Sequence, residues 1–462
     1  MDRTSPEGLP RVIGFWGGFG VIVGITIGGG IFRKPATLAA DVGDPLSILA
    51  LWVAFGLVSL CGALAIAELA SMMPQTGGVY VYLRAAYGAP AAFVFGWLYL
   101  LVATPAAIGA LAVFFAELVV RLAGSDPGQV ATGLLIGLAG AAILVLTAVN
   151  VLGARLGSAV QTLLTVVKVA TLAALVVAAF GAPGGSFAHL APAGAGPRHL
   201  GLGVASVIWA YDGWIAVSMI AGEVVAAERL MRRIVVAGMS TIVLLYVGAN
   251  VGYFYAMPVE VMARQTAGVP QWIMAKVLGV AGSTVIGAAI LCSVAGALNG
   301  NILAKPRVVY ALARDGLTFS FLGRAHPRWA TPHHAILIQA AVALLLVGLL
   351  RDFDRLTTYF VVVERCALLF AVGAVLVLRR RLPDAPRPFR TPGHPWVPLL
   401  FLTGTSVGLV AIVRGDLARA VPDYSPLVGL LIAGAGFPVY YLWRRLAGPG
   451  SAVVRRVPEK EG

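Results

Sequence analysis

A run of three glycines interrupts the first long apolar segment of the chain, in the stretch VGITIGGGIF. Each glycine costs a helix about 1 kcal/mol relative to alanine, so we expect the helix to unwind at Gly28, Gly29 and Gly30. Hydrocarbon cannot satisfy the freed N–H groups, so the break should line a cavity, and the helix that restarts there turns its positive end toward an anion such as a carboxylate. Close helix packing through Gly20, Gly24 and Gly28 is a structural alternative that can coexist with this role.

A second interruption, IWAYDGW, lies deep in a later apolar segment. It sets the carboxylate of Asp212 at mid-membrane depth, where a charge costs about 2.5–3.5 kcal/mol, so we expect protein or water around it. Asp212 either caps the broken helix or contacts a substrate ammonium or a proton. Trp209 is either a packing residue or an aromatic lid over the site.

Charged residues also occur in two other apolar segments. Lys168 is central in QTLLTVVKVATLAALVV, with no acid within a turn on its own helix. It must therefore find partners across the bundle, and the carbonyls of a broken helix are the expected acceptors. Glu364 and Arg365 are adjacent in their segment and can satisfy each other or their neighbours, which favours a structural role.

The composition requires these residues to be carried by membrane helices. Of 462 residues, 59% are hydrophobic and 12% are charged, and the mean hydropathy is +0.89. A soluble domain cannot hide so much apolar surface, and the apolar runs are too long and continuous for barrel strands. The net charge of +14 belongs to loops and tails, so no nucleic-acid partner is expected and the lipid bilayer is the main surrounding.

The charge-free stretches predict an all-α integral membrane protein with twelve spans. The predicted spans are 12–32, 45–68, 89–117, 129–153, 156–181, 200–222, 234–258, 277–304, 332–350, 356–378, 396–413 and 425–443. Twelve crossings put both termini on one side. A cytoplasmic N-terminus places 22 of the 34 Lys and Arg residues inside and ten outside, as the positive-inside rule favours, and we expect a multi-pass protein of the plasma membrane.

Interruptions in the first and sixth spans indicate an inverted repeat, since they fall five spans apart. The predicted domains are a cytoplasmic tail (1–11), a first five-helix repeat (12–181), a second inverted repeat (200–380), two peripheral helices (396–443) and a second cytoplasmic tail (444–462).

Six motifs, in order along the chain, resemble the amino acid–polyamine–organocation superfamily, and specifically its L-type amino acid transporter branch. They are VGITIGGGIF, AELASMMPQTGGVYVYL, the fifth-span Lys168, IWAYDGW, GALNGNILAKPRVVYALARDGL and RPFRTPGHPWVPLL. The resemblance covers roughly residues 12–400. It implies a LeuT-like fold of five-plus-five inverted repeats with broken first and sixth helices, alternating access, and sodium-independent transport of α-amino acids.

The resemblance also assigns roles to single residues. The glycine amides match the stretch that takes the substrate carboxylate, the carbonyls of Ile25, Ile27, Trp209 and Ala210 match those that hold the amine, and Trp209 matches an aromatic gate. The expected substrate-binding set is Ile25, Thr26, Ile27, Gly28, Gly29, Gly30, Trp209, Ala210, Asp212 and Gly213. Lys168 is similar to the lysine that replaces a coupling sodium ion. Asn299 and Gly300 belong to an eighth-span signature of unassigned role.

Two departures from the family pattern and several alternatives remain open. Gly29 stands where many relatives have serine, and GEVVAAERLMRR lacks the usual proline. The expected pocket wall contains no basic group, which favours neutral substrates: Thr26, Ala106, Ala107, Trp209, Ile215 and Ala216. Asp212 keeps cationic amino acids open, and proton-coupled symport or a non-transporting sensor are alternatives to exchange. No enzyme chemistry, cofactor, metal site or partner subunit is indicated, and paired helix breaks argue against a channel.

Overall fold

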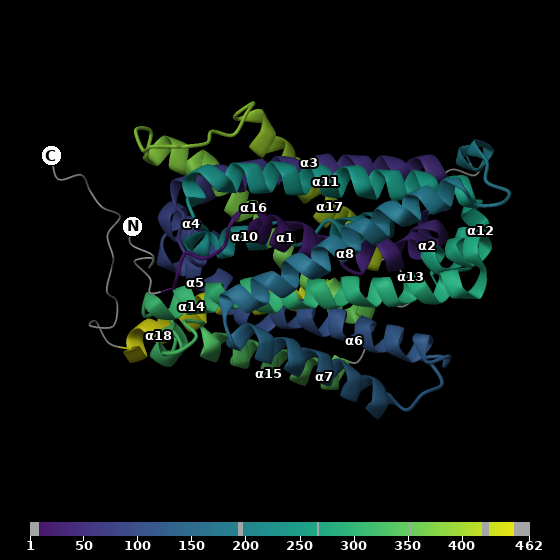
Figure 1. The fold of residues 1–462 in the computed structure, drawn as a ribbon. Helices are drawn as coiled ribbons and strands as arrows, with labels where there is room; N and C mark the ends of the chain where they lie inside the picture. The colour runs from purple at the N-terminus through teal and green to yellow at the C-terminus, as the bar shows by residue number, and fades with distance from the viewer. Residues whose placement is uncertain (1–8, 193–196, 266–267, 351–352, 418–424, 448–462) are drawn as a thin grey trace.

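The computed structural model describes residues 9–192, 197–265, 268–350, 353–417 and 425–447, and these form helices joined by short loops (Figure 1). In chain order the α-helices are α1 (Phe15–Thr26), α2 (Gly30–Val42), α3 (Pro45–Met72), α4 (Val79–Tyr87), α5 (Ala89–Leu98), α6 (Thr104–Leu122), α7 (Thr132–Val151), α8 (Ala154–Phe180), α9 (Leu200–Ala210), α10 (Ala216–Met219), α11 (Ala227–Ala256), α12 (Val259–Ala263), α13 (Val269–Ala304), α14 (Pro306–Arg314), α15 (His333–Leu350), α16 (Phe353–Arg381), α17 (Trp396–Leu417) and α18 (Ser425–Ala447).

The all-α membrane fold predicted from the sequence is confirmed. Among the described residues, eleven helical stretches are long and apolar enough to cross a membrane. The predicted sixth span, 200–222, contains instead the shorter apolar helix α9, then a turn, then α10. The predicted tails 1–11 and 444–462 lie largely outside the described residues.

The first predicted span is broken where the glycines predicted a break. Helix α1 ends at Thr26, Ile27 has a non-helical ψ of 77°, and α2 begins at Gly30. The predicted end at residue 32 was wrong, because the helix continues to Val42. Its amphipathic second half carries charged residues that break the apolar run without ending the helix.

The sixth span is also broken as predicted. Helix α9 ends at Ala210, and the chain turns through residues 211–215 before α10. Gly213 has φ +109°, a conformation that L side chains rarely adopt.

The third span carries an irregularity that the sequence analysis did not predict. A π-helical segment, η1 (Tyr99–Ala103), joins α5 to α6. Pro105 is the second residue after it, and a proline cannot donate an N–H bond and crowds the carbonyl four residues earlier. The wider π turn relieves that conflict and directs Tyr99 into the core, where it is fully buried.

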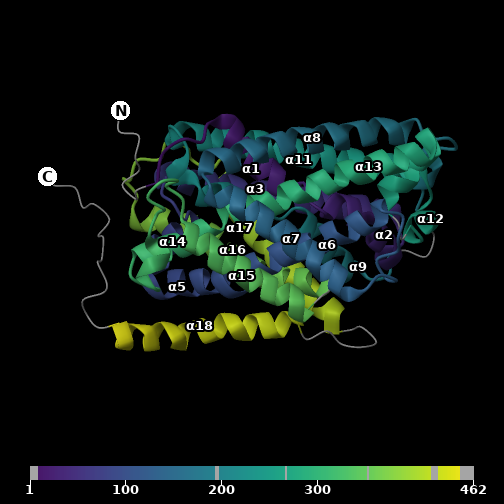
Figure 2. The same ribbon diagram turned by 60° about the horizontal axis from the view of Figure 1, so that its bottom comes forward.

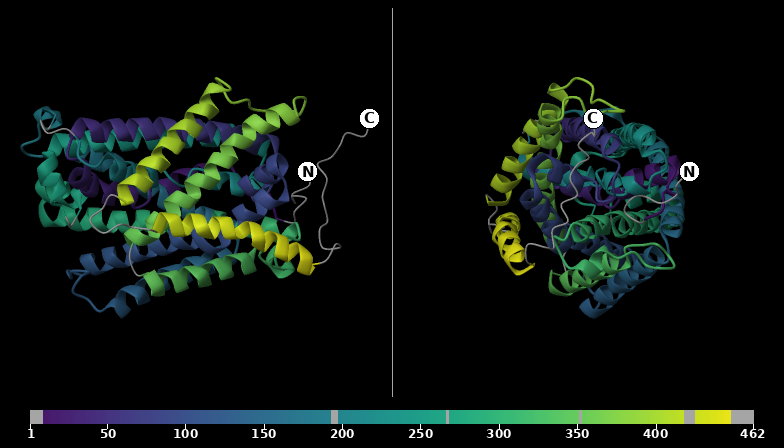
Figure 3. Two further views of the ribbon diagram at one scale, coloured as in Figure 1. Left: turned by 180° about the vertical axis from the view of Figure 1, so that it is seen from behind. Right: turned by 90° about the vertical axis from the view of Figure 1, so that its left-hand side faces the viewer.

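The helices form one elongated bundle with distinct ends. Helices α2 and α12 lie at one end, and α4, α5 and α14 lie at the other (Figures 1 and 2). We call these the α2 end and the α14 end. Helix α18 lies on the outside of the bundle (Figure 3). Only 17% of its most apolar stretch, within Leu427–Leu446, is buried.

Candidate substrate-binding site

The two helix breaks lie directly against each other. A Cβ atom added to Gly30 would lie 2.6 Å from the Cα of Ala210, and one added to Gly213 would lie 2.5 Å from the Cγ2 of Ile25. Real Cβ atoms essentially never approach other heavy atoms so closely, so any residue larger than glycine would force a shift at either position. The structure thus brings the predicted segments 25–30 and 209–213 together at one place in the bundle.

The N-terminus of α2 provides free N–H groups at this junction. The first hydrogen bond of that helix runs from the N–H of Arg33 to the O of Gly29, over 2.9 Å. The N–H groups of Gly30, Ile31 and Phe32 precede it and have no partner within the helix. Gly28 differs, because its N–H donates to the O of Thr26 over 2.8 Å. Of the three glycine amides predicted to bind a carboxylate, that of Gly28 is therefore already engaged.

Lys168 of α8 donates three hydrogen bonds to backbone carbonyls. Its Nζ lies 2.6 Å from the O of Gly24, 2.8 Å from the O of Ile27 and 2.8 Å from the O of Ser293. The side chain is fully buried, so all three ammonium donors are matched without water. One charge thereby joins the end of α1, the break and α13.

The carbonyl of Ile27 is correspondingly crowded. Besides Lys168 it accepts from the Oγ of Ser293 over 3.1 Å, which uses both of its lone pairs. It was predicted to hold a substrate amine, and in this arrangement it holds Lys168 instead.

Tyr246 of α11 ties the two breaks to each other, and the sequence analysis missed it. Its hydroxyl lies 2.7 Å from the O of Thr26 and 3.1 Å from the O of Ala210. The ring is fully buried and packs edge-on against Trp52. A buried tyrosine usually needs a partner for its hydroxyl, so its occurrence in STIVLLYVGAN was the available signal.

Asp212 is paired with Arg365 of α16. The Nη2 of Arg365 lies 2.7 Å from the Oδ1 of Asp212 and 3.1 Å from the O of Ile208. Glu364 does not pair with its sequence neighbour, because its Oε1 accepts from the hydroxyl of Tyr99 over 2.5 Å. Both adjacent charges of α16 thus find partners on other segments of the bundle.

Comparisons with known proteins agree with this architecture. A family model described as amino acid permease matches residues 13–440. The chain belongs to the amino acid permease family. The serine/threonine exchanger SteT of Bacillus subtilis is 31% identical over 95% of this chain and 98% of its own length. The b(0,+)-type amino acid transporter 1 and the large neutral amino acids transporter small subunit 2, both of Mus musculus, are each 29% identical, over 94% and 95% of this chain and 88% and 84% of their own lengths. These relatives place the permease in the amino acid–polyamine–organocation superfamily.

The residues predicted to line the permease site are all buried, and all are apolar or aromatic except Thr26. Trp209 is 8% exposed, and the other members are at least as buried: Thr26, Ala106, Ala107, Ile215 and Ala216. Phe114 completes this side, since its ring would lie 2.8 Å from a Cβ added to Gly29. The Cζ of Arg33 lies over the Phe114 ring, 5.2 Å from its centroid, and Arg33 forms an ion pair with Glu117.

Asn299 acquires a role as part of a chain of buried amides. It accepts from Asn150 over 2.8 Å and donates to the Oε1 of Gln161 over 2.9 Å. Gln161 in turn donates to the O of Gly20 in α1 over 3.1 Å. The eighth-span signature therefore connects α7, α8 and α13 to the first helix.

A buried ion pair lies at the α14 end of the permease. Arg307 of α14 binds Glu223 through two nitrogens, at 2.8 and 3.1 Å, and both side chains are fully buried. The O of Glu223 also accepts from the N–H groups of Val12 and Ile13, each over 2.9 Å. The segment before α1 and the segment after α10 are thus held together beneath the breaks.

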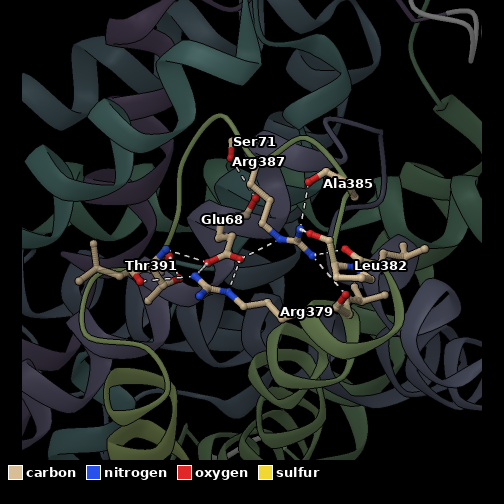
Figure 4. A network of polar contacts seen from close by, with 10 residues as sticks. Glu68, Ser71, Arg379, Leu382, Ala385, Arg387 and Thr391 are labelled. Atoms are coloured by element: carbon tan, nitrogen blue, oxygen red, sulfur yellow. Dashed lines mark hydrogen bonds and ion pairs between the residues drawn. The ribbon is translucent and has the colours of Figure 1, made fainter.

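A second carboxylate at this end fixes the loop between α16 and α17, as Figure 4 shows. Glu68 accepts from Arg379 and from the N–H of Thr391, each over 2.7 Å, and Arg387 lies 3.3 Å away. This loop carries the RPFRTPGHP motif. In the same loop, burial lowers the pKa of His394, and the neighbouring Arg379 guanidinium lowers it further. Among the described residues, no group of three His, Cys, Asp or Glu side chains could hold a metal ion.

Proposed function

We propose that the permease transports neutral L-amino acids without sodium, by alternating access of the junction between the two helix breaks. The amino acid carboxylate meets the free N–H groups at the start of α2, where the helix dipole favours an anion. The amine meets carbonyls at the ends of α1 and α9. The side chain lies against the small wall residues, such as Ala106 and Ala107, which offer no charge to a charged substrate.

The main support for sodium-independent transport is the position of the Lys168 ammonium. It supplies a positive charge and three donors to the carbonyls that surround the first break and α13. A sodium ion bound at this place would coordinate the same type of carbonyl oxygen. A tethered cation therefore stabilises the broken helix with no ion gradient.

Exchange is the favoured mode, and the name of the relative SteT describes a serine/threonine exchanger. Proton-coupled symport is the second candidate, favoured by the fully buried Glu364 and Lys168 inside the spans. We further propose that the permease lies in the plasma membrane with both termini in the cytoplasm. It is expected to act as a transporter and not an enzyme, and no partner subunit is indicated by its own residues.

Uptake into proteoliposomes tests the proposal. Purified permease should take up labelled serine, threonine or leucine equally in sodium and in choline medium, and unlabelled internal amino acid should accelerate uptake. Acceleration by an inward proton gradient without internal amino acid would favour symport instead. Saturable binding with no uptake under any condition would identify a sensor, and strict sodium dependence would refute the proposal.

A further inference from the structure

Asp212 belongs to the second helix break, and its carboxylate is paired with a cation. Asp212 follows Trp209 and Ala210 by two or three residues, and Ala210 contacts the first residue of α2. Its side chain is only 5% exposed, and that of Arg365 is only 3% exposed. A carboxylate so far from water must be paired with a cation or hydrogen-bond donors.

Arg365 contacts both the carboxylate that it neutralises and the helix before it, α9. Its Nη2 donates both to the Oδ1 of Asp212 and to the O of Ile208, at the end of α9. The guanidinium therefore lies at the C-terminal end of α9, where carbonyls without an intrahelical partner attract a cation. Two acceptors thus hold this guanidinium nitrogen beside the carboxylate.

Further charged groups lie close to this pair. Glu364, the residue before Arg365, accepts a hydrogen bond from the hydroxyl of Tyr99. Asp212, Arg365 and Lys305 all lie within electrostatic reach of Glu364, so two acids and two bases are grouped here. A substrate side chain that carries a charge would interact with all of them in a low-dielectric site.

We propose that Arg365 determines the specificity of the permease for neutral side chains, by neutralising the carboxylate of Asp212. Without Arg365, the carboxylate attracts an ammonium or guanidinium, so lysine and arginine become ligands. Without Asp212, the guanidinium attracts a carboxylate, so glutamate becomes a ligand. This inference rests on the proposed function, because it assumes that an amino acid occupies the junction.

Equilibrium binding to purified permease tests the inference with matched pairs of ligands. Norleucine and lysine differ mainly in an ammonium, and glutamine and glutamate differ mainly in a negative charge. In the wild type, norleucine should bind and lysine should not compete. In Arg365→Met, the affinity for lysine relative to norleucine should rise about tenfold or more, and in Asp212→Asn the affinity for glutamate relative to glutamine should rise similarly. The double variant Asp212→Asn/Arg365→Met should lose both gains.

Arg379→Met is the matched control, because it removes a guanidinium from a carboxylate pair on the same helix α16, at the α14 end. It should leave both ligand ratios unchanged. An assembled Arg365→Met protein that binds norleucine and still rejects lysine would overturn the inference alone. If that variant fails to assemble, Asp212→Asn decides, and continued rejection of glutamate overturns the inference. A wild type that binds no neutral amino acid would overturn the proposed function as well.

Discussion

A single ammonium group on α8 joins two segments of this permease that are distant in sequence, residues 24–27 and Ser293 of α13. Lys168 reaches the carbonyls of Gly24, Ile27 and Ser293 from the middle of α8. Removing it would take one donor from each of these buried carbonyls, in a region that water does not reach, and the O of Ile27 would keep only the hydroxyl of Ser293. The effect on the shape of the break should exceed the effect on insertion, because the long apolar helices remain.

Lys168→Ala should therefore reduce transport severely, by about a hundredfold, because a break that is held less rigidly positions the amides and carbonyls poorly. Lys168→Arg should recover only part of the activity, since the planar guanidinium is wider than an ammonium. Initial rates of uptake into proteoliposomes measure both variants. Lys276→Ala, which removes an exposed lysine from α13, is the control. Normal transport by Lys168→Ala would rule out this role of the ammonium.

Gly29→Leu should abolish binding, because its Cβ would lie 2.8 Å from the ring of Phe114 and its side chain would fill the space before the N-terminus of α2. Because the substrate carboxylate could no longer reach the N-terminus of α2, the affinity should fall below the measurable range. Equilibrium binding of a neutral amino acid measures it. Gly137→Leu is the matched control, because a Cβ at Gly137 meets open space. Full affinity in Gly29→Leu would exclude this end of α2 as the carboxylate site.

The residues that the sequence identified were those with local signals. Three consecutive glycines and a lysine in an apolar segment are unusual at any position in a span, so they could be found without a fold. The partnership of Asp212 with Arg365 could not, because 153 residues separate them. Tyr246 was missed because a tyrosine in a span is equally compatible with packing, and only its two carbonyl partners distinguish the roles.

At the scale of elements, predictions from apolar runs succeeded where the helix was uniformly apolar and failed where it was amphipathic. The first span was predicted to end at residue 32, because α2, the second half of the helix, has charged residues on one face and apolar residues on the other. Helix α14 was not predicted, because its strongly amphipathic sequence resembles a loop in a hydropathy profile. The π-helical segment η1 was not predicted, because the sequence alone does not show how the helix accommodates Pro105.

Helix α14 is expected to stabilise the form of the permease that is closed at its own end. Breaking a buried ion pair by removing one partner costs about 3–5 kcal/mol, so Arg307→Met should shift the population toward forms open at the α14 end. The buried Ser218 of α10 can report this opening, if Ser218→Cys is introduced into a variant without native cysteines. Its reaction with a hydrophilic thiol reagent should accelerate.

Arg314→Met, at an exposed position of the same helix, should leave the reaction rate unchanged. The double variant Glu223→Gln/Arg307→Met should restore slow labelling, at least in part, because no unpaired charge remains buried. Equal labelling rates in Arg307→Met and in its parent would show that the ion pair does not control closure at this end.

At the scale of the whole molecule, the sequence predicts that the two sides of the membrane differ in basic residues. The twelve-span prediction places 22 of the 34 Lys and Arg residues on the side of the N-terminus. In the structure, Arg314 ends α14, and Arg381 of α16 donates to the O of Ala86 in α4, so both lie at the α14 end. Anionic lipids of the cytoplasmic leaflet and the insertion machinery both favour this distribution. The α14 end is therefore expected to face the cytoplasm.

Labelling of single cysteines in intact cells tests this orientation. In a variant without Cys61, Cys292 and Cys366, Ser125→Cys lies on the exposed loop after α6, and Ser320→Cys lies in the exposed segment after α14. A membrane-impermeant maleimide should label the first position in intact cells and the second only after the cells are opened, because the bilayer separates them. Labelling of both after permeabilisation controls for reactivity. The reverse pattern would show that the charge asymmetry does not set the orientation of this permease, and would place the Glu223–Arg307 closure on the outer side.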